Sequence, residues 1–247
     1  TAGEDGSFPD ASYTVQVRAL SAAALLFDGE ATMAKQAANT WSFYTVQAPA
    51  NAVGWDLRLL NISDSQVEMI VSFDELPEFS NLDDPRHSFS PRTIAPGQAL
   101  HGGMDWTADD KTADGSDALD KTLLMGMGHP LLPGTYYVGV FSPASAAAYT
   151  LRSRGIGDGF TLPVNRLDFS GEGATAANSK LLPREAAYYR VDVPPEATSW
   201  RVQLTANEGE SLLIAQQGAL PNSAAEDGPA TLLNGGKKMQ KAGNEHY

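Results

Sequence analysis

The chain has 247 residues, a formal net charge of −13 and no cysteine. The acidic excess argues against nucleic acid as a partner, because phosphate binding needs clustered Lys and Arg, and the lack of cysteine excludes disulfides and thiolate metal sites. No apolar run reaches the roughly 18 residues that a membrane-spanning helix needs, so no membrane insertion is expected. An apolar content of 42% is typical of a globular protein of one or two domains.

Short runs of alternating apolar and polar side chains recur along the chain, separated by turns that contain Gly and Pro. Few windows keep the period of about 3.6 residues that marks an amphipathic helix, whereas alternation with β-branched and aromatic side chains is typical of strands. In chain order the predicted strands cover residues 13–18, 41–46, 55–60, 67–71, 135–141, 149–152, 188–193, 200–204 and 211–214. The pattern predicts an all-β sandwich or barrel.

An internal repeat organises the chain. Residues 43–59 align with residues 188–204, which lie 145 positions further along. The matched pairs are Val46 with Val191, Pro49 with Pro194, Ala52 with Ala197, Trp55 with Trp200, and Leu59 with Leu204; Gly29 also corresponds to Gly171, and Leu76 to Leu220. Self-similarity of this kind predicts tandem modules of one architecture.

A second match sets the module boundaries. Residues 11–15 resemble residues 147–151, which close the first repeat. Residues 1–20 are therefore expected to be the closing strand of a preceding module or an N-terminal extension. The two repeats are assigned to residues 21–155, a complete sandwich, and 156–247, a second sandwich.

The second repeat is expected to be incomplete at its C-terminal end. It contains no counterpart of residues 132–138 or of the closing strand at Tyr149. A sandwich without these strands would expose open sheet edges and part of its core. The chain is therefore read as part of a longer protein, or as a protein whose missing strands are supplied by a partner.

Three segments of the repeat carry a resemblance to a known family. They are an aromatic strand–turn–strand unit at residues 41–59, a strand that runs into a Leu-Pro turn at residues 67–77, and a closing strand pair at residues 132–152. The Pro-Gly-Thr-Tyr-Tyr-Val run of residues 133–138 is the most specific signal. Together they resemble the bacterial pre-peptidase C-terminal (PPC) domain family. The resemblance implies tandem jelly-roll-like antiparallel β-sandwiches in an exported protein, either secreted, periplasmic or at the cell surface.

The first repeat departs from the family pattern in a polar insertion between about residues 81 and 120, which contains the candidate metal site. Carboxylates clustered there could supply the oxygen ligands that Ca²⁺ requires. Residues 110–115 have the spacing that opens an EF-hand loop, but its twelfth position is Lys121 rather than Glu. A solvated acidic loop, with Asp residues forming turns, is the alternative. The candidate ligands are Asp105, Asp109, Asp110, Asp114 and Asp117.

The aromatic residues divide into expected core residues and one candidate ligand-binding residue. Trp55 and Trp200 stand at equivalent positions at the start of alternating strands, which predicts repeated core packing. Tyr136 and Tyr149 are assigned to the same core. Trp106 lies in the acidic insertion, where an exposed ring could stack on a sugar, although a ring that caps the sandwich edge is the alternative.

No catalytic motif is recognisable in the sequence. It contains neither a His-Glu-x-x-His pair nor a Gly-x-Ser-x-Gly elbow, and its four histidines are scattered through loop-like segments. We expect a module without catalytic activity that spaces, docks or assembles through a protein partner. A carbohydrate-binding module that recognises a polysaccharide and a hydrolase fragment are the alternatives. No cofactor other than Ca²⁺ is expected.

Overall fold

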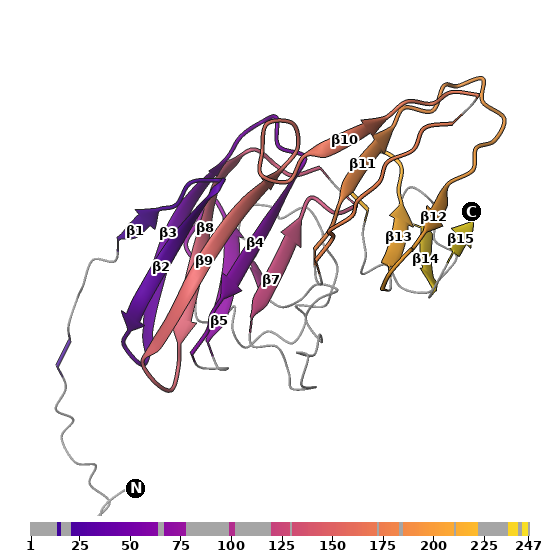
Figure 1. Cartoon of the computed structure of the whole chain (residues 1–247). Coiled ribbons are helices and arrows are strands. Elements are labelled where there is room, and N and C mark those ends of the chain that lie inside the picture. Colours follow the sequence, from indigo (N-terminus) through magenta and orange to yellow (C-terminus); the bar gives the residue numbers. More distant parts are fainter. Residues whose placement is uncertain are drawn as a thin grey trace, which may run out of the picture.

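The protein is all-β, as the sequence predicts (Figure 1). The computed structural model describes residues 14–15, 21–63, 67–77, 99–101, 120–128, 130–171, 173–182, 185–209, 211–221, 237–241 and 244–246. Within these ranges the chain forms strands β1 to β15 and no helix. Of the N-terminal segment 1–20, only residues 14 and 15 fall within the described ranges.

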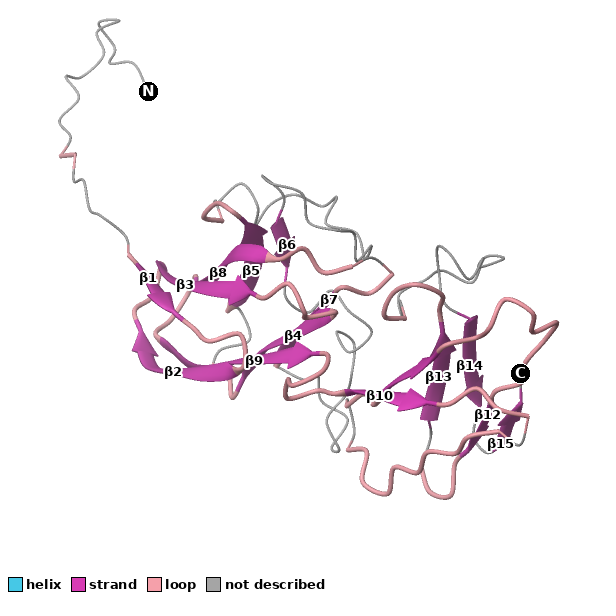
Figure 2. Cartoon of the chain, turned by 90° about the horizontal axis from the view of Figure 1, so that it is seen from above, coloured by secondary structure: helices cyan, strands magenta, loops and turns pink. Residues whose placement is uncertain are grey.

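Nine strands form the first repeat. In chain order they are β1 (Ala22–Ala24), β2 (Gly29–Gln36), β3 (Thr40–Ala48), β4 (Gly54–Leu60), β5 (Glu68–Phe73), β6 (Ala99–His101), β7 (Lys121–Met125), β8 (Gly134–Ser142) and β9 (Ala147–Ile156). They are ordered into a five-stranded sheet, β1-β3-β8-β5-β6, and a four-stranded sheet, β2-β9-β4-β7. Buried side chains from both sheets share one hydrophobic core, so the sheets form a sandwich (Figures 1 and 2).

One strand pair of this repeat departs from the expected antiparallel pattern. β1 runs parallel to β3, with Ala22 beside Phe43, whereas the other pairs are antiparallel. Parallel neighbours require a crossover connection. The strand β2 supplies it, because it follows β1 in the chain but lies in the opposite sheet.

Trp55 lies at the centre of the sandwich core. Its ring is fully buried, and its Nε1 donates a hydrogen bond of 2.8 Å to Ser153 Oγ on β9. The ring of Tyr136 on β8 packs edge-on against it, with the centroids 5.3 Å apart. Tyr149 on β9 is buried too, and its hydroxyl lies 3.1 Å from the hydroxyl of Tyr44 on β3. The predicted core positions of Trp55, Tyr136 and Tyr149 are therefore confirmed.

Six described strands belong to the second repeat. They are β10 (Val164–Leu167), β11 (Tyr188–Val191), β12 (Gln203–Thr205), β13 (Ser211–Ala215), β14 (Lys237–Lys241) and β15 (Asn244–His246). They form three two-stranded sheets, β10-β11, β12-β15 and β13-β14.

The strand pairings of the second repeat copy those of the first. β10 runs parallel to β11 with Val164 beside Tyr188, as β1 runs parallel to β3 with Ala22 beside Phe43. β12 pairs with β15 as β4 pairs with β7, and β13 pairs with β14 as β5 pairs with β6. The repeated sequence therefore produces a repeated strand arrangement.

Two strand positions of the first repeat have no occupant among the described strands of the second. β8 lies between β3 and β5, and β9 lies between β2 and β4. The neighbours β3, β4 and β5 correspond to β11, β12 and β13 of the second repeat. Each of these three has one strand partner within the described ranges. Residues 173–178, which correspond to part of β2, form no strand. This follows from the pairing of the first repeat, because β2 is hydrogen-bonded to β9 alone among the described strands.

The predicted core position of Trp200 is wrong. Trp200 is 43% exposed, whereas Trp55 is 0% exposed, and it lies outside any strand. The physical reason is that no described strand covers the side chain of Trp200. Trp55 is enclosed by Ser153 of β9 and Tyr136 of β8, and neither strand has a counterpart in the described part of the second repeat.

Truncation of the two tryptophans should therefore have unequal effects. Trp55→Ala is expected to lower the free energy of unfolding by about 3–5 kcal/mol, because it leaves a cavity in a closed core. Trp200→Ala should cost less than about 1 kcal/mol, as is usual for substitutions outside a packed core. Urea denaturation followed by far-UV circular dichroism measures both values. Equal losses of stability in the two variants would contradict the assigned difference in burial.

Candidate functional site: the joint between the repeats

The outer face of β4 and β9 carries charged side chains, although the sequence there is that of a central strand pair. Trp55, Leu57 and Leu59 point into the sandwich core, so the residues between them point outward. The register of the two strands sets Asp56 beside Arg154. Charged side chains at such positions are normally solvated, but this face is buried.

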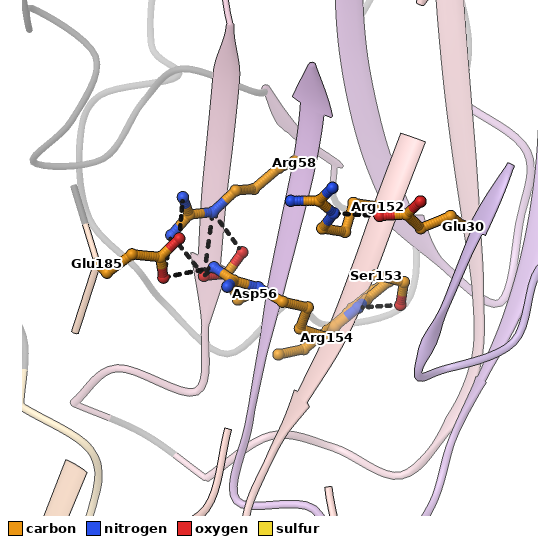
Figure 3. Close-up of polar contacts among 8 residues, drawn as sticks. Glu30, Asp56, Arg58, Arg152, Ser153, Arg154 and Glu185 are labelled. Atoms are coloured by element: carbon orange, nitrogen blue, oxygen red, sulfur yellow. Dashed lines mark hydrogen bonds and ion pairs between the residues drawn. The ribbon is translucent and has the colours of Figure 1, made fainter. Parts of the chain in front are cut away.

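A closed cluster of four charged side chains lies on this face (Figure 3). Its members are Asp56, Arg58, Arg154 and Glu185. Arg58 Nε contacts Asp56 Oδ1 at 2.9 Å, and Arg154 Nη2 contacts Asp56 Oδ2 at 2.8 Å. Glu185, which precedes β11, contacts both arginines, at 3.0 Å from Arg58 Nη1 and 2.9 Å from Arg154 Nη2. Two positive and two negative groups therefore share one site, which joins the sheet of the first repeat to the second repeat.

Burial makes these contacts stronger than surface ion pairs. The Asp56 side chain is 2% exposed and that of Arg154 is 13% exposed. Burial alone would lower the pKa of Arg154, but the carboxylates of Asp56 and Glu185 outweigh it and raise the pKa above its ordinary value. Each arginine bonds to both carboxylates, so the removal of any one charge would leave an uncompensated charge in a poorly solvated place.

An apolar patch continues the joint beside the cluster. Ile156 of β9, Tyr188 of β11 and Leu220 form a second buried group, separate from the sandwich core. Burial raises the pKa of Tyr188, and the negative charge of Asp56 adds to this effect. The backbone amide of Gly128 also donates a hydrogen bond of 2.7 Å to the carbonyl of Leu220.

Gly54 is the residue that permits this close approach. A Cβ atom at this position would lie 2.3 Å from Leu220 Cδ1 and 2.9 Å from the carbonyl oxygen of Met125. The second contact is with backbone, which cannot move aside easily. The equivalent position of the second repeat is Ser199. In the first repeat the glycine leaves room both for Leu220 at the joint and for the backbone of β7 in its own sheet.

The sequence prediction did not identify this cluster. The signal that could have found it is the alternation of Asp56 and Arg58 with Trp55, Leu57 and Leu59 in a central strand. Such charges are usually solvated, and nothing local in the sequence places Glu185 against them, because it lies more than a hundred residues away.

The predicted metal and sugar sites fall outside the described residues. This applies to Asp105, Asp109, Asp110, Asp114, Asp117 and Trp106. Within the described ranges, no group of three or more His, Asp or Glu side chains is placed to hold a metal ion. Calcium binding and the aromatic platform at Trp106 stay predictions.

Comparison with known proteins assigns no family: no family model matches the chain, and no curated protein is significantly similar to it. The likeness to the PPC domain family therefore rests on the sequence motifs and stays a prediction. In the described part of the chain, no helix has the length and apolar character needed to cross a membrane.

Loss of one charge from the cluster should lower the stability of the protein strongly. Asp56→Asn is expected to lower the free energy of unfolding by about 3–5 kcal/mol, because both arginines lose their shared buried partner. The matched control is Glu30→Gln, which breaks the exposed pair between Glu30 and Arg152 on the same sheet and should cost less than about 1 kcal/mol. Urea denaturation of the intact chain measures both. A similar loss in the two variants would show that the cluster does not stabilise the joint.

Proposed function

We propose that the chain is a non-catalytic structural module of an exported bacterial protein, which spaces, docks or assembles through protein partners and whose second repeat accepts added β-strands. The observation that carries the proposal is the open sheet edge of β12, which has β15 as its one partner among the described strands, whereas β4 is paired on both sides. Unpaired strand edges are templates for strand addition.

Two exposed aromatic side chains of the second repeat support strand addition. Trp200 is 43% exposed and Tyr189 is 39% exposed, although their equivalents in the first repeat, Trp55 and Tyr44, are buried. Large apolar side chains that are buried in one repeat and exposed in the other indicate a surface that a further strand or partner can cover. An added strand that occupied the position of β9 would cover both rings, as β9 covers Trp55 and Tyr44.

The joint supports a spacing role in the same module. Asp56, Arg58, Arg154 and Glu185 tie the first repeat to the second through buried ion pairs, and the patch around Tyr188 adds apolar contact. We infer that these contacts restrict how the two repeats move relative to each other. The likeness to the PPC domain family and the absence of cysteine agree with an exported accessory module, which would be secreted, periplasmic or at the cell surface.

A peptide with the sequence of residues 146–155 tests strand acceptance, because it reproduces β9 of the first repeat. Added to the intact chain, it should bind saturably, slow hydrogen exchange at the amides of β12 that face away from β15, and shift the fluorescence of Trp200 to the blue. Trp200→Phe should remove the fluorescence change without removing the exchange protection.

The matched control peptide carries Pro in place of Leu151. Proline removes a backbone donor and is poorly accommodated within a sheet, so this peptide should neither bind nor protect β12. Absence of protection with the unmodified peptide, at concentrations up to its solubility, would refute strand acceptance at the second repeat.

A further inference from the structure

A short segment at the start of β11 supplies three kinds of side chain to the joint. Tyr188 and Ala186 both pack into the apolar patch, which includes Ile156 of the first repeat. Glu185 precedes them in the chain and contacts both arginines of the charge cluster. The second repeat therefore meets the first with an aromatic ring, a small apolar side chain and a carboxylate, all within four consecutive positions.

The first repeat presents the same face at the start of β3. The alignment of the repeats sets Glu185, Ala186 and Tyr188 opposite Thr40, Trp41 and Phe43. The parallel neighbours of the two strands also correspond, because β1 lies beside β3 as β10 lies beside β11. Tyr44 belongs to the sandwich core, so Phe43 and Trp41 point to the outer face of the sheet. The face that docks in the second repeat is therefore present in the first.

In the first repeat the ring of Trp41 covers this face. It is stacked on Phe43, with the centroids 5.4 Å apart and the planes 7° apart, and its centroid lies 5.0 Å from that of Phe141. A Cβ atom at Gly139, which lies beside Phe43 on β8, would come within 2.7 Å of the Trp41 ring, so this glycine lets the ring lie across the sheet. The second repeat has Ala186 at the position of Trp41, which leaves the face open to the joint.

The two other positions differ as well. Glu185 is replaced by Thr40, whose Oγ1 donates a hydrogen bond of 2.6 Å to the carbonyl of Ala37 in its own turn. Tyr188 is replaced by Phe43, which has no hydroxyl. The first repeat therefore lacks both the charge and the hydroxyl that the second repeat brings to the joint.

We propose that Glu185, Ala186 and Tyr188 make the outer face of the second repeat a docking surface, and that Trp41 closes the same surface in the first repeat. The inference rests on the spacing role in the proposed function and identifies the residues that select the docking partner. The partner that this surface fits is a sheet face that carries paired aspartate and arginine side chains beside an apolar patch. Selection thus combines an attraction with a steric block.

Ala186→Trp tests the steric block, because it gives the second repeat the residue of the first. The ring should separate the repeats. The amide of Gly128, whose hydrogen bond of 2.7 Å to the Leu220 carbonyl crosses the joint, should then exchange at least about tenfold faster. The amide of Val138 on β8 should keep its wild-type exchange rate. Wild-type protection of Gly128 in this variant would overturn the proposal.

The matched control is Glu196→Trp. It adds the same ring at an exposed position that makes no contact with the apolar patch, so both the Gly128 and the Val138 amides should exchange as in the wild-type chain. Faster exchange at Gly128 in the control, equal to that in Ala186→Trp, would show that any added indole opens the joint and would refute the assigned role of residue 186.

Glu185→Thr tests the attraction without adding bulk. It removes the carboxylate that both arginines contact, and exchange at Gly128 should again rise at least about tenfold, while the amides of β10 and β11 stay protected. This variant decides the outcome if Ala186→Trp also opens the pairing of β10 with β11. Wild-type exchange at Gly128 in Glu185→Thr would overturn the proposal.

The exchange data also separate this inference from strand acceptance. If the peptide of residues 146–155 does not bind but both variants open the joint, the docking surface stands and strand acceptance fails. If the peptide binds and Gly128 stays protected in both variants, strand acceptance stands and the docking surface fails.

Discussion

The central placement of the last two strands is the constraint on which the first repeat depends. β8 lies between β3 and β5 in one sheet, and β9 lies between β2 and β4 in the other, so the last two strands of the repeat each complete one sheet. Side chains of these two strands enclose Trp55 and Tyr44. Without these two strands the sheets divide into the pairs β1-β3, β5-β6 and β4-β7 and the unpaired β2, and the described part of the second repeat consists of the three corresponding pairs. Two-stranded sheets are marginal by themselves, so such a repeat depends on strands or surfaces from elsewhere.

Strand β4 contributes to two interfaces at once. Alternate residues of β4 point into the core of the first repeat and toward the second repeat, so nearly the whole strand is buried. The outward side of β4 is polar, and its contacts are ion pairs, which depend on direction. The inward side is apolar and tolerates exchange of one apolar residue for another. The ion pairs around Asp56 therefore fix orientation, while the patch around Tyr188 and Leu220 removes water from the contact.

The sequence was sufficient to predict what local pattern and repetition determine. The all-β class, the strands around Trp55 and Tyr149, and the shared architecture of the repeats follow from alternation and self-similarity. The burial of Trp200 did not, because burial depends on strands that are distant in the sequence and not on the residue itself. The charge cluster was missed for a similar reason: Glu185 approaches Asp56 only after the chain has passed through β4 to β9. The antiparallel expectation failed at β1, where the strand order depends on a crossover that no local signal reports.

The residues on the inner faces of β4 and its counterpart β12 are similar in the two repeats, whereas those on the outer faces differ. The two repeats are therefore not interchangeable at the joint. Trp55, Leu57 and Leu59 have the apolar counterparts Trp200, Val202 and Leu204, whereas Asp56 and Arg58 are replaced by Arg201 and Gln203, and Gly54 by Ser199. The face of β4 that receives the second repeat is therefore not reproduced on β12, and a third module could not dock there through the same contacts. The two repeats therefore share their strand pairings but not their outward residues, and the charged face of β4 has no counterpart on β12.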